Sequence, residues 1–125
     1  MYQIEQQSIR FSNGKRYQFQ AEIAEVIDFD DAVVIRLLVT PTSITQNVFS
    51  LDYRGNLLWQ IPQPRSFSPQ SPYVSLFRKG EYVDVLNWDG HVVTMHPKLG
   101  DILKEDYFLG GASPSRRVPS ARRWI

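Results

Sequence analysis

Two histidines are the side chains of this sequence best suited to acid–base or metal chemistry, and they lie five residues apart, at His91 and His96. His91 ends the stretch NWDGH (87–91), which also contains an indole and a carboxylate. A neutral imidazole can ligate a metal or transfer a proton near neutral pH. NWDGH is therefore either part of an active site or a turn between two strands.

The turn is the interpretation that the flanking residues favour. Asp89-Gly90 is a strong signal for a two-residue hairpin loop between apolar runs. Such a loop places Trp88 directly opposite His91, so that imidazole and indole pack as a cross-strand pair. His96 lies at an odd separation along the same strand and points to the opposite face. We therefore expect no catalytic role and no metal for either histidine.

Other sites of catalysis or metal binding find little support. The acidic residues between 22 and 31 lack the ligand spacing of a calcium loop, and we interpret them as solvated turn residues. The chain has no cysteine, which excludes disulfides, thiolate zinc sites and a cysteine nucleophile. No G-x-S-x-G elbow or phosphate-binding glycine loop occurs. We expect a protein that is not an enzyme and needs no cofactor, with an enzyme of dispersed carboxylates as a minor alternative.

The C-terminal stretch GGASPSRRVPSARRWI (110–125) carries four arginines and no acid, whereas residues 1–109 carry ten basic and thirteen acidic side chains. Its glycines and prolines oppose regular structure, and we expect a flexible basic tail. The tail either solubilises the protein, docks on an acidic protein surface or binds nucleic acid through phosphate contacts and base stacking. We favour protein over nucleic acid, because the acidic body would repel phosphates. The candidate partner-binding residues are Arg116, Arg117, Arg122, Arg123 and Trp124.

Strand patterns cover the rest of the chain, and no window keeps apolar residues at helical spacing. Asn13-Gly14 between two alternating runs predicts a type I′ hairpin over 8–20. Further strands are expected at about 23–28, 32–39, 47–52, 56–61, 73–77, 81–88, 91–96 and 101–107.

A proline-rich stretch over 62–72 divides these strands into two similar halves. Residues 26–38 match 75–87 at an offset of 49, and 48–59 match 92–104 at an offset of 44 to 45. Residues 40–46 of the first half are replaced by the predicted two-residue loop in the second. A period in the forties with four short strands has the size of one β-propeller blade.

The stretch NVFSLDYRGNLLWQI (47–61) resembles the repeats of pyrroloquinoline-quinone-type β-propellers, in which an apolar strand and Asp precede a glycine turn, two apolar residues and Trp. The second copy departs from the pattern, with His96 in place of Asp and Lys104 in place of Trp. The arrangement also resembles small uncharacterised bacterial proteins. The resemblance implies blade architecture and no activity, since two units form no ring axis for a quinone. The matching residues are Leu51, Asp52, Gly55, Leu57, Leu58 and Trp59, then Gly100, Ile102 and Leu103.

Together these patterns predict a single all-β domain over 1–109, with antiparallel meander sheets. Two blade-like four-stranded units, at about 23–61 and 73–107, follow the N-terminal hairpin as a sandwich or an incomplete propeller. We expect nine or ten strands and little helix. The core candidates are Ile23, Val33, Ile35, Leu37, Phe49, Leu51, Leu58, Val83, Val85, Val92, Trp59 and Trp88.

The function expected from these features is a non-catalytic protein–protein interaction module of a bacterial cell, an adaptor or an immunity-like inhibitor. Nucleic-acid binding through the tail is the alternative. The first residues lack the basic and apolar segments of a signal peptide, and no apolar run spans a membrane, so we expect a cytoplasmic protein. The hairpin over 8–20 is expected to cap one sheet edge, which leaves the other edge for a homodimer.

Overall fold

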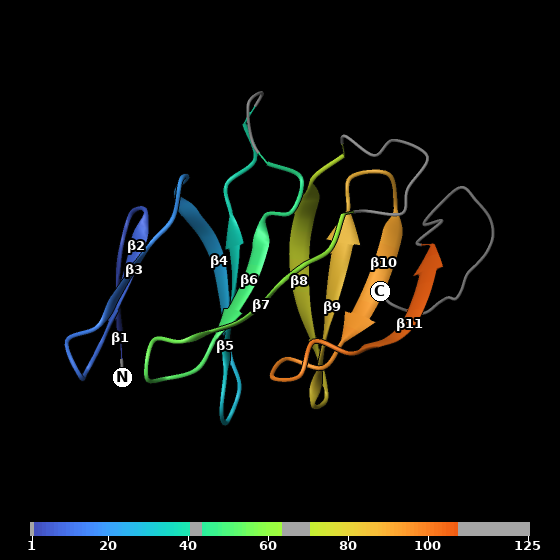
Figure 1. Ribbon diagram of the computed structural model, residues 1–125. Coiled ribbons are helices and arrows are strands. Elements are labelled where there is room, and N and C mark those ends of the chain that lie inside the picture. The colour runs from blue at the N-terminus through green and yellow to red at the C-terminus, as the bar shows by residue number, and fades with distance from the viewer. Residues whose placement is uncertain (1, 41–43, 64–70, 108–125) are drawn as a thin grey trace.

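The chain folds into three antiparallel β-sheets stacked side by side, seen in the computed structural model over residues 2–40, 44–63 and 71–107 (Figure 1). The N-terminal sheet contains β1 (Tyr2–Glu5), β2 (Ser8–Phe11) and β3 (Arg16–Gln18). The middle sheet contains β4 (Ile23–Asp28), β5 (Val33–Leu37), β6 (Val48–Leu51) and β7 (Leu57–Gln60). The C-terminal sheet contains β8 (Tyr73–Lys79), β9 (Tyr82–Asn87), β10 (His91–Met95) and β11 (Ile102–Tyr107).

The all-β prediction and the two four-stranded meanders are confirmed. Both larger sheets run in chain order, β4-β5-β6-β7 and β8-β9-β10-β11 in space. Their strands correspond one to one with the two halves of the internal repeat. The expected strand number was too low, because β1 pairs with β2 and extends the hairpin to a three-stranded sheet. None of the described segments forms a helix, so none forms a helix that is long and apolar enough to cross a membrane.

The hairpin turns differ from the predicted two-residue type. Gly14 has a φ of 90° while Asn13 keeps a negative φ, so the turn is not type I′. The amide of Phe11 donates to the carbonyl of Lys15 at 2.8 Å across a three-residue loop. The β9–β10 turn has the same form, with Gly90 at 96° and its amide donating to Asn87 at 2.9 Å. A single left-handed glycine after a type I turn also suits the strand twist.

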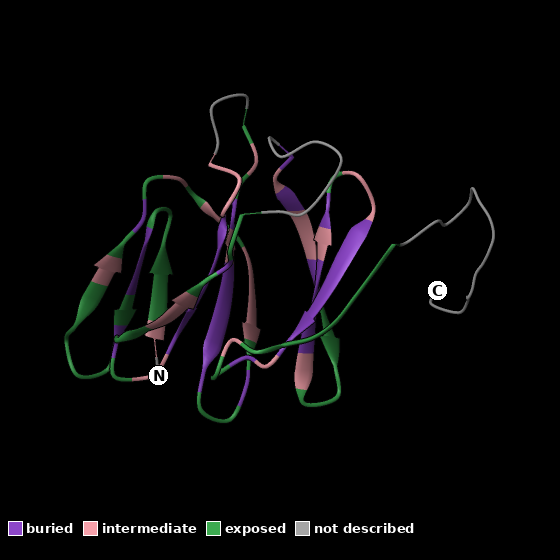
Figure 2. Cartoon of the chain, turned by 45° about the vertical axis from the view of Figure 1, so that its right-hand side comes forward, coloured by how far each residue is buried: buried purple, intermediate pink, exposed green. Residues whose placement is uncertain are grey.

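The two central strands of the middle sheet, β5 and β6, are buried on both faces, which explains their continuous apolar runs. Alternate residues of β5 point to opposite sides, so Ile35 faces the N-terminal sheet and Val34 faces the C-terminal sheet. Figure 2 shows the burial in the middle strands and the exposed β11. The cluster on the N-terminal side contains Ile9, Phe11, Phe19, Val33, Ile35, Leu37, Phe49 and Leu51. The cluster on the C-terminal side contains Phe29, Val34, Val48, Ile61, Tyr73, Leu76, Val83, Val85, Val93 and Met95.

The N-terminal sheet covers a face of the middle sheet and does not cap an edge, contrary to expectation. Phe19 packs against Phe49 with ring centroids 5.0 Å apart, and Ile9 is fully buried in the same cluster. Ile9, Phe11 and Phe19 of the hairpin are all buried in this cluster, and such side chains bury more apolar surface against a face of a sheet than against its edge. At the edge of the middle sheet, the two sheets share one backbone hydrogen bond, from the amide of Ile23 in β4 to the carbonyl of Gln6 at 2.7 Å.

Most of the predicted core is confirmed, and Trp88 is the clear error. Trp88 is 72% exposed at the tip of the β9–β10 turn. Its place in the sequence beside an apolar run suggested a strand residue, but the longer loop moves it out of the sheet. The predicted residues that are buried are Val33, Ile35, Leu37, Phe49, Leu51, Val83, Val85 and Val92, while Ile23, Leu58 and Trp59 are partly buried.

Polar groups also join the middle and C-terminal sheets. The fully buried amide of Asn47 donates to the carbonyls of Leu37 and Tyr73, at 3.2 and 2.9 Å, and accepts from the amide of Tyr73 at 3.0 Å. The carbonyl of Pro97 accepts from the Ser50 hydroxyl at 2.5 Å and from the Trp59 indole at 2.9 Å. These bonds fix how the two sheets sit against each other.

Candidate functional site

The β9–β10 turn holds the exposed Trp88 on a backbone that is fixed by hydrogen bonds. The side chain of Asn87 accepts from the Asp89 amide at 3.2 Å and donates to the Ser71 carbonyl at 3.0 Å. The Trp88 amide donates to the Pro72 carbonyl at 3.0 Å. Asn87 is buried, so its bonds are shielded from water. The turn is therefore tied to the chain before β8 and presents the indole outward.

His91 does not pack against Trp88 as predicted. The three-residue loop places His91 beside β11, where its ring lies 5.0 Å from that of Tyr107. Its Nε2 lies 3.1 Å from the Glu105 carboxylate, and the side chain is almost fully buried. The Nδ1 of His91 and the Oδ2 of Asp89 are buried without a hydrogen-bond partner among the described residues.

Tyr73 lies close to the same acidic groups. Burial first, and then the charges of Glu105 and Asp89, raise the pKa of Tyr73 to about 12. Its hydroxyl is therefore protonated at neutral pH. The group around His91 combines one imidazole, two carboxylates and a phenol at one end of the C-terminal sheet.

His96 lies one residue beyond the end of β10 and not on the strand that was predicted over 91–96, so strand alternation does not set its direction. Its ring is 5.9 Å from that of Tyr82. The Nδ1 of His96 accepts from the amides of Lys98 and Leu99, at 3.2 and 3.1 Å. The imidazole thus caps the turn before β11.

Asp52 caps the equivalent turn of the middle sheet. Its Oδ1 accepts from the amides of Arg54 and Asn56, both at 2.9 Å. Burial alone would raise the pKa of the Asp52 carboxyl, but the bonds from Asn56 and Arg54 lower it below its usual value. The substitution of His for Asp in the second repeat therefore preserves the capping role.

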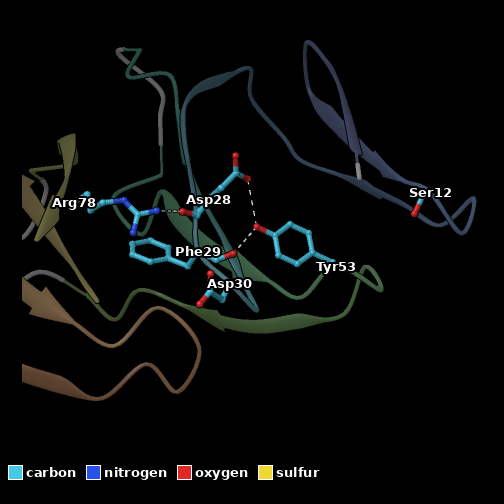
Figure 3. Close-up of a pocket in the computed structure, with 6 residues that line it drawn as sticks. All are labelled: Ser12, Asp28, Phe29, Asp30, Tyr53 and Arg78. Atoms are coloured by element: carbon cyan, nitrogen blue, oxygen red, sulfur yellow. Dashed lines mark hydrogen bonds between the residues drawn. The ribbon is translucent and has the colours of Figure 1, made fainter. Parts of the chain in front are cut away.

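A pocket of about 550 Å³ lies where the β4–β5 turn meets β8 and the turn after β6 (Figure 3). The guanidinium of Arg78 lies over the Phe29 ring, 4.2 Å from its centroid, and donates to the backbone carbonyl of Asp28. In Figure 3 the Asp30 carboxylate lies on the same side as Phe29, and Ser12 lies apart at the far rim. The lining residues are Ser12, Asp28, Phe29, Asp30, Tyr53 and Arg78.

Tyrosine hydroxyls hold Asp28 in place at this pocket. Its Oδ1 accepts from Tyr2 at 2.7 Å and from Tyr53 at 3.3 Å. Tyr53 also donates toward the carbonyls of Phe29 and Ala32, at 2.7 and 3.1 Å. Burial, and then the charge of Asp28, raise the pKa of Tyr53 to about 12. Burial, and then the hydrogen bond to Asp28, raise the pKa of Tyr2. Both phenols are protonated donors at neutral pH.

The chemistry available at the pocket is recognition of charge. Two carboxylates and one guanidinium line it, and neither a histidine nor a serine–histidine pair is among the lining residues. Within the described part of the chain, no three His, Asp or Glu side chains are placed to hold a metal ion. The Asp28 carboxylate, held by two tyrosine hydroxyls, together with the Asp30 carboxylate and the aromatic rings, suits a cationic ligand.

The sequence pointed to only part of these sites. The acidic run over 22–31 contains Asp28 and Asp30, but Glu25 binds Arg36 at 2.6 Å and Asp31 lies 3.5 Å from Lys98. Tyr53 and Arg78 were missed, because they are far from the run in sequence and only the stacking of sheets brings them together. The candidate tail residues Arg116, Arg117, Arg122, Arg123 and Trp124 lie outside the described residues.

Comparison with known proteins gives a family and no activity. A family profile described as "Domain of unknown function (DUF7957)" matches residues 1–107, which is most of the chain. A search of the curated proteins found no match. What these sites do must therefore be argued from their geometry.

Proposed function

The chain belongs to the DUF7957 family, whose function is unknown, and we propose that it is a non-catalytic protein-interaction module. The observation that carries the proposal is the indole of Trp88, 72% exposed on a turn fixed by hydrogen bonds. Tryptophan is enriched among the residues that dominate binding energy at protein interfaces. A rigid turn presents it at a low entropic cost on binding.

The outer edge of the C-terminal sheet supports the same proposal. Within the described residues β11 pairs on one side only, with β10, and all six of its residues are exposed. Leu103 is 59% exposed at a bulge, where it has no partner opposite in β10. Edge strands with apolar side chains are natural sites for an added strand.

We place this activity in the cytoplasm, where a chain without cysteine loses nothing to the reducing conditions. We also propose a homodimer, in which the edge of β11 meets a second copy. Light scattering that gives a mass near 14.5 kDa at micromolar concentration would contradict the dimer and leave the module itself unaffected.

Affinity capture from the native host with wild-type protein and a Trp88→Ala variant tests the module. We expect one protein partner that binds the wild type reproducibly and is lost from Trp88→Ala, with at least a tenfold drop for a residue contributing about 2 kcal/mol. Phe77→Ala is the matched control, because Phe77 is another exposed aromatic residue of the same sheet, at 52%. Thermal melts of both variants verify that the fold is retained.

Two outcomes would contradict the proposal. A partner that binds Trp88→Ala as well as wild type would remove the indole from the interface. Recovery of nucleic acid alone, released by salt, would favour the alternative in which the four arginines of 110–125 neutralise phosphates.

A further inference from the structure

We propose that the pocket lined by Asp28, Asp30 and Tyr53 binds arginine side chains, and that its occupant is the arginine-rich segment 110–125 of this protein. The proposal goes beyond the protein-interaction function, and it does not depend on Trp88 or β11. It assigns a ligand class to the pocket and a binding site to the basic segment.

The pocket already accommodates one guanidinium. Arg78 stacks on Phe29 and donates to the carbonyls of Asp28 and Gly80, so its cation is held by an aromatic face and by backbone oxygens. None of these partners is a carboxylate. The two carboxylates of the lining are left for a second cation, and with Arg78 they give the pocket one net negative charge.

Acceptors for a second guanidinium are present and free. Asp30 is exposed and forms no hydrogen bond or ion pair with the described residues. The Oδ1 of Asp28 is occupied by the two tyrosine hydroxyls, which orient the carboxylate, and its Oδ2 has no such partner. A planar guanidinium donates two parallel bonds to a carboxylate, which a lysine ammonium cannot do.

The segment 110–125 has the composition that this pocket requires. It contains the pairs Arg116-Arg117 and Arg122-Arg123 and no acidic residue to compete for them. Residues 1–109 carry three more acidic than basic side chains, so the long-range attraction favours the same contact. Trp124 adds an aromatic side chain directly after the second pair.

The length of the segment is sufficient. Beyond Tyr107, the fifteen residues to Arg122 span at most about 50 Å when extended. The six residues of β11 span about 20 Å, and neighbouring strands lie about 5 Å apart, so the pocket is within reach in one chain. The same contact can also form from a second copy, and the chemistry is identical in the two cases.

Nuclear magnetic resonance of the full chain tests the contact from both sides. We expect Asp30→Asn to shift the indole N–H signal of Trp124. We expect replacement of the four tail arginines by glutamine to shift the amide signals of Phe29 and Asp30. Asp101→Asn is the matched control, because Asp101 is also an exposed carboxylate without a side-chain partner among the described residues. Both shifts should vanish in about 0.5 M salt, where screening is strong.

Dilution distinguishes the two sources of the segment. A contact within one chain does not depend on the protein concentration. Signal shifts that stay the same between about 20 and 500 µM protein therefore indicate the chain's own segment. Shifts that fade on dilution, together with a doubled mass, indicate a second copy; both results support the proposal.

The proposal is overturned if Asp30→Asn moves the Trp124 signal no more than Asp101→Asn does. It is equally overturned if replacing the four arginines by glutamine leaves the amide signals of Phe29 and Asp30 unchanged. A Trp124 signal that responds only to an added single-stranded oligonucleotide would assign the segment to nucleic acid instead. The spread of amide signals in each spectrum shows that the variants are folded.

Discussion

At the scale of single residues, tyrosine side chains connect segments of this protein that are far apart in the sequence. Tyr53 joins the turn after β6 to the β4–β5 turn, and Tyr2 joins the N-terminal sheet to Asp28. Tyr73 is buried between the middle and C-terminal sheets. Because burial and nearby carboxylates disfavour the phenolate, these residues make the fold sensitive to alkaline pH.

We predict a loss of stability in alkaline solution. The pKa values of Tyr53 and Tyr73 rise from 10.0 to about 12 on folding, so the unfolded chain releases these protons first. The stabilisation is complete below about pH 10 and is lost as the pH rises toward 12. Each tyrosine contributes a slope of at most about 1.4 kcal/mol per pH unit.

Urea unfolding between pH 8 and 12 measures this slope, and Tyr73→Phe should reduce it. The hydrogen bonds between Tyr73 and Asn47 use the backbone of Tyr73, so this variant removes the titrating group and keeps those bonds. An unchanged slope in Tyr73→Phe would show that burial of this phenol does not govern the alkaline transition.

The sequence could predict residue roles only where local geometry decides them. The positions of the hairpin turns at Asn13-Gly14 and Asp89-Gly90 depend on neighbouring residues alone, and they were predictable. The exposure of Trp88 depends on one extra residue in a loop, which Asp-Gly does not reveal. The pocket residues Tyr53 and Arg78 come together through packing between sheets, for which the chain carries no local signal.

At the scale of elements, the contact between β7 and the turn before β11 connects the two repeats. The Trp59 indole donates to Pro97, and its ring lies against Gly100, which has a φ of +78°. A Cβ at Gly100 would lie 2.9 Å from Cδ1 of Trp59. Glycine is thus required twice, for the left-handed backbone and for the close approach of the ring.

We predict that Gly100→Ala destabilises the fold more than Gly80→Ala. Both substitutions force alanine into a left-handed conformation, at a cost of about 1 to 2 kcal/mol. Gly80, with a φ of +62°, has no atom within 4 Å of its Cβ position, so it isolates the backbone cost. The clash with Trp59 should add about 1 to 3 kcal/mol. Equal losses of free energy in urea unfolding would mean that the indole moves aside freely.

Elements were easier to predict from the sequence than turns or layers. Strand positions follow from alternation and from short apolar runs, and each of the ten expected strands is present. The turn type at Asn13-Gly14 was not predictable, because one or two left-handed residues both suit that dipeptide. Whether the N-terminal hairpin packs on a face or an edge of the next sheet was also not predictable, because both arrangements require the same alternation of apolar and polar residues.

At the scale of the whole molecule, the middle sheet belongs to both hydrophobic clusters. β5 and β6 contribute Ile35 and Phe49 to one cluster, and Val34 and Val48 to the other. If either outer sheet unfolds, one face of β5 and β6 becomes exposed to water. The three sheets therefore depend on one another for their stability.

We predict that Phe19→Ala, in the N-terminal cluster, lowers the unfolding midpoint reported by Trp59 at the opposite face of the middle sheet. The cavity should cost about 3 to 5 kcal/mol, and a cooperative fold transmits it to every probe. Trp59 fluorescence can be isolated by replacing Trp88 and Trp124 with phenylalanine. A shift confined to the amides of β2 would instead show that the N-terminal sheet unfolds separately.

The doubly covered middle sheet also affects synthesis on the ribosome. Its strands have all been synthesised once Ile61 has left the ribosome. The side chains of Val34 and Val48 are covered only after β8 to β11 have followed. At ~5–20 residues per second, the interval to Tyr107 lasts roughly 2 to 9 s. During that time the nascent chain displays an apolar sheet to chaperones and to neighbouring nascent chains, so slowing translation after residue 61 should increase aggregation.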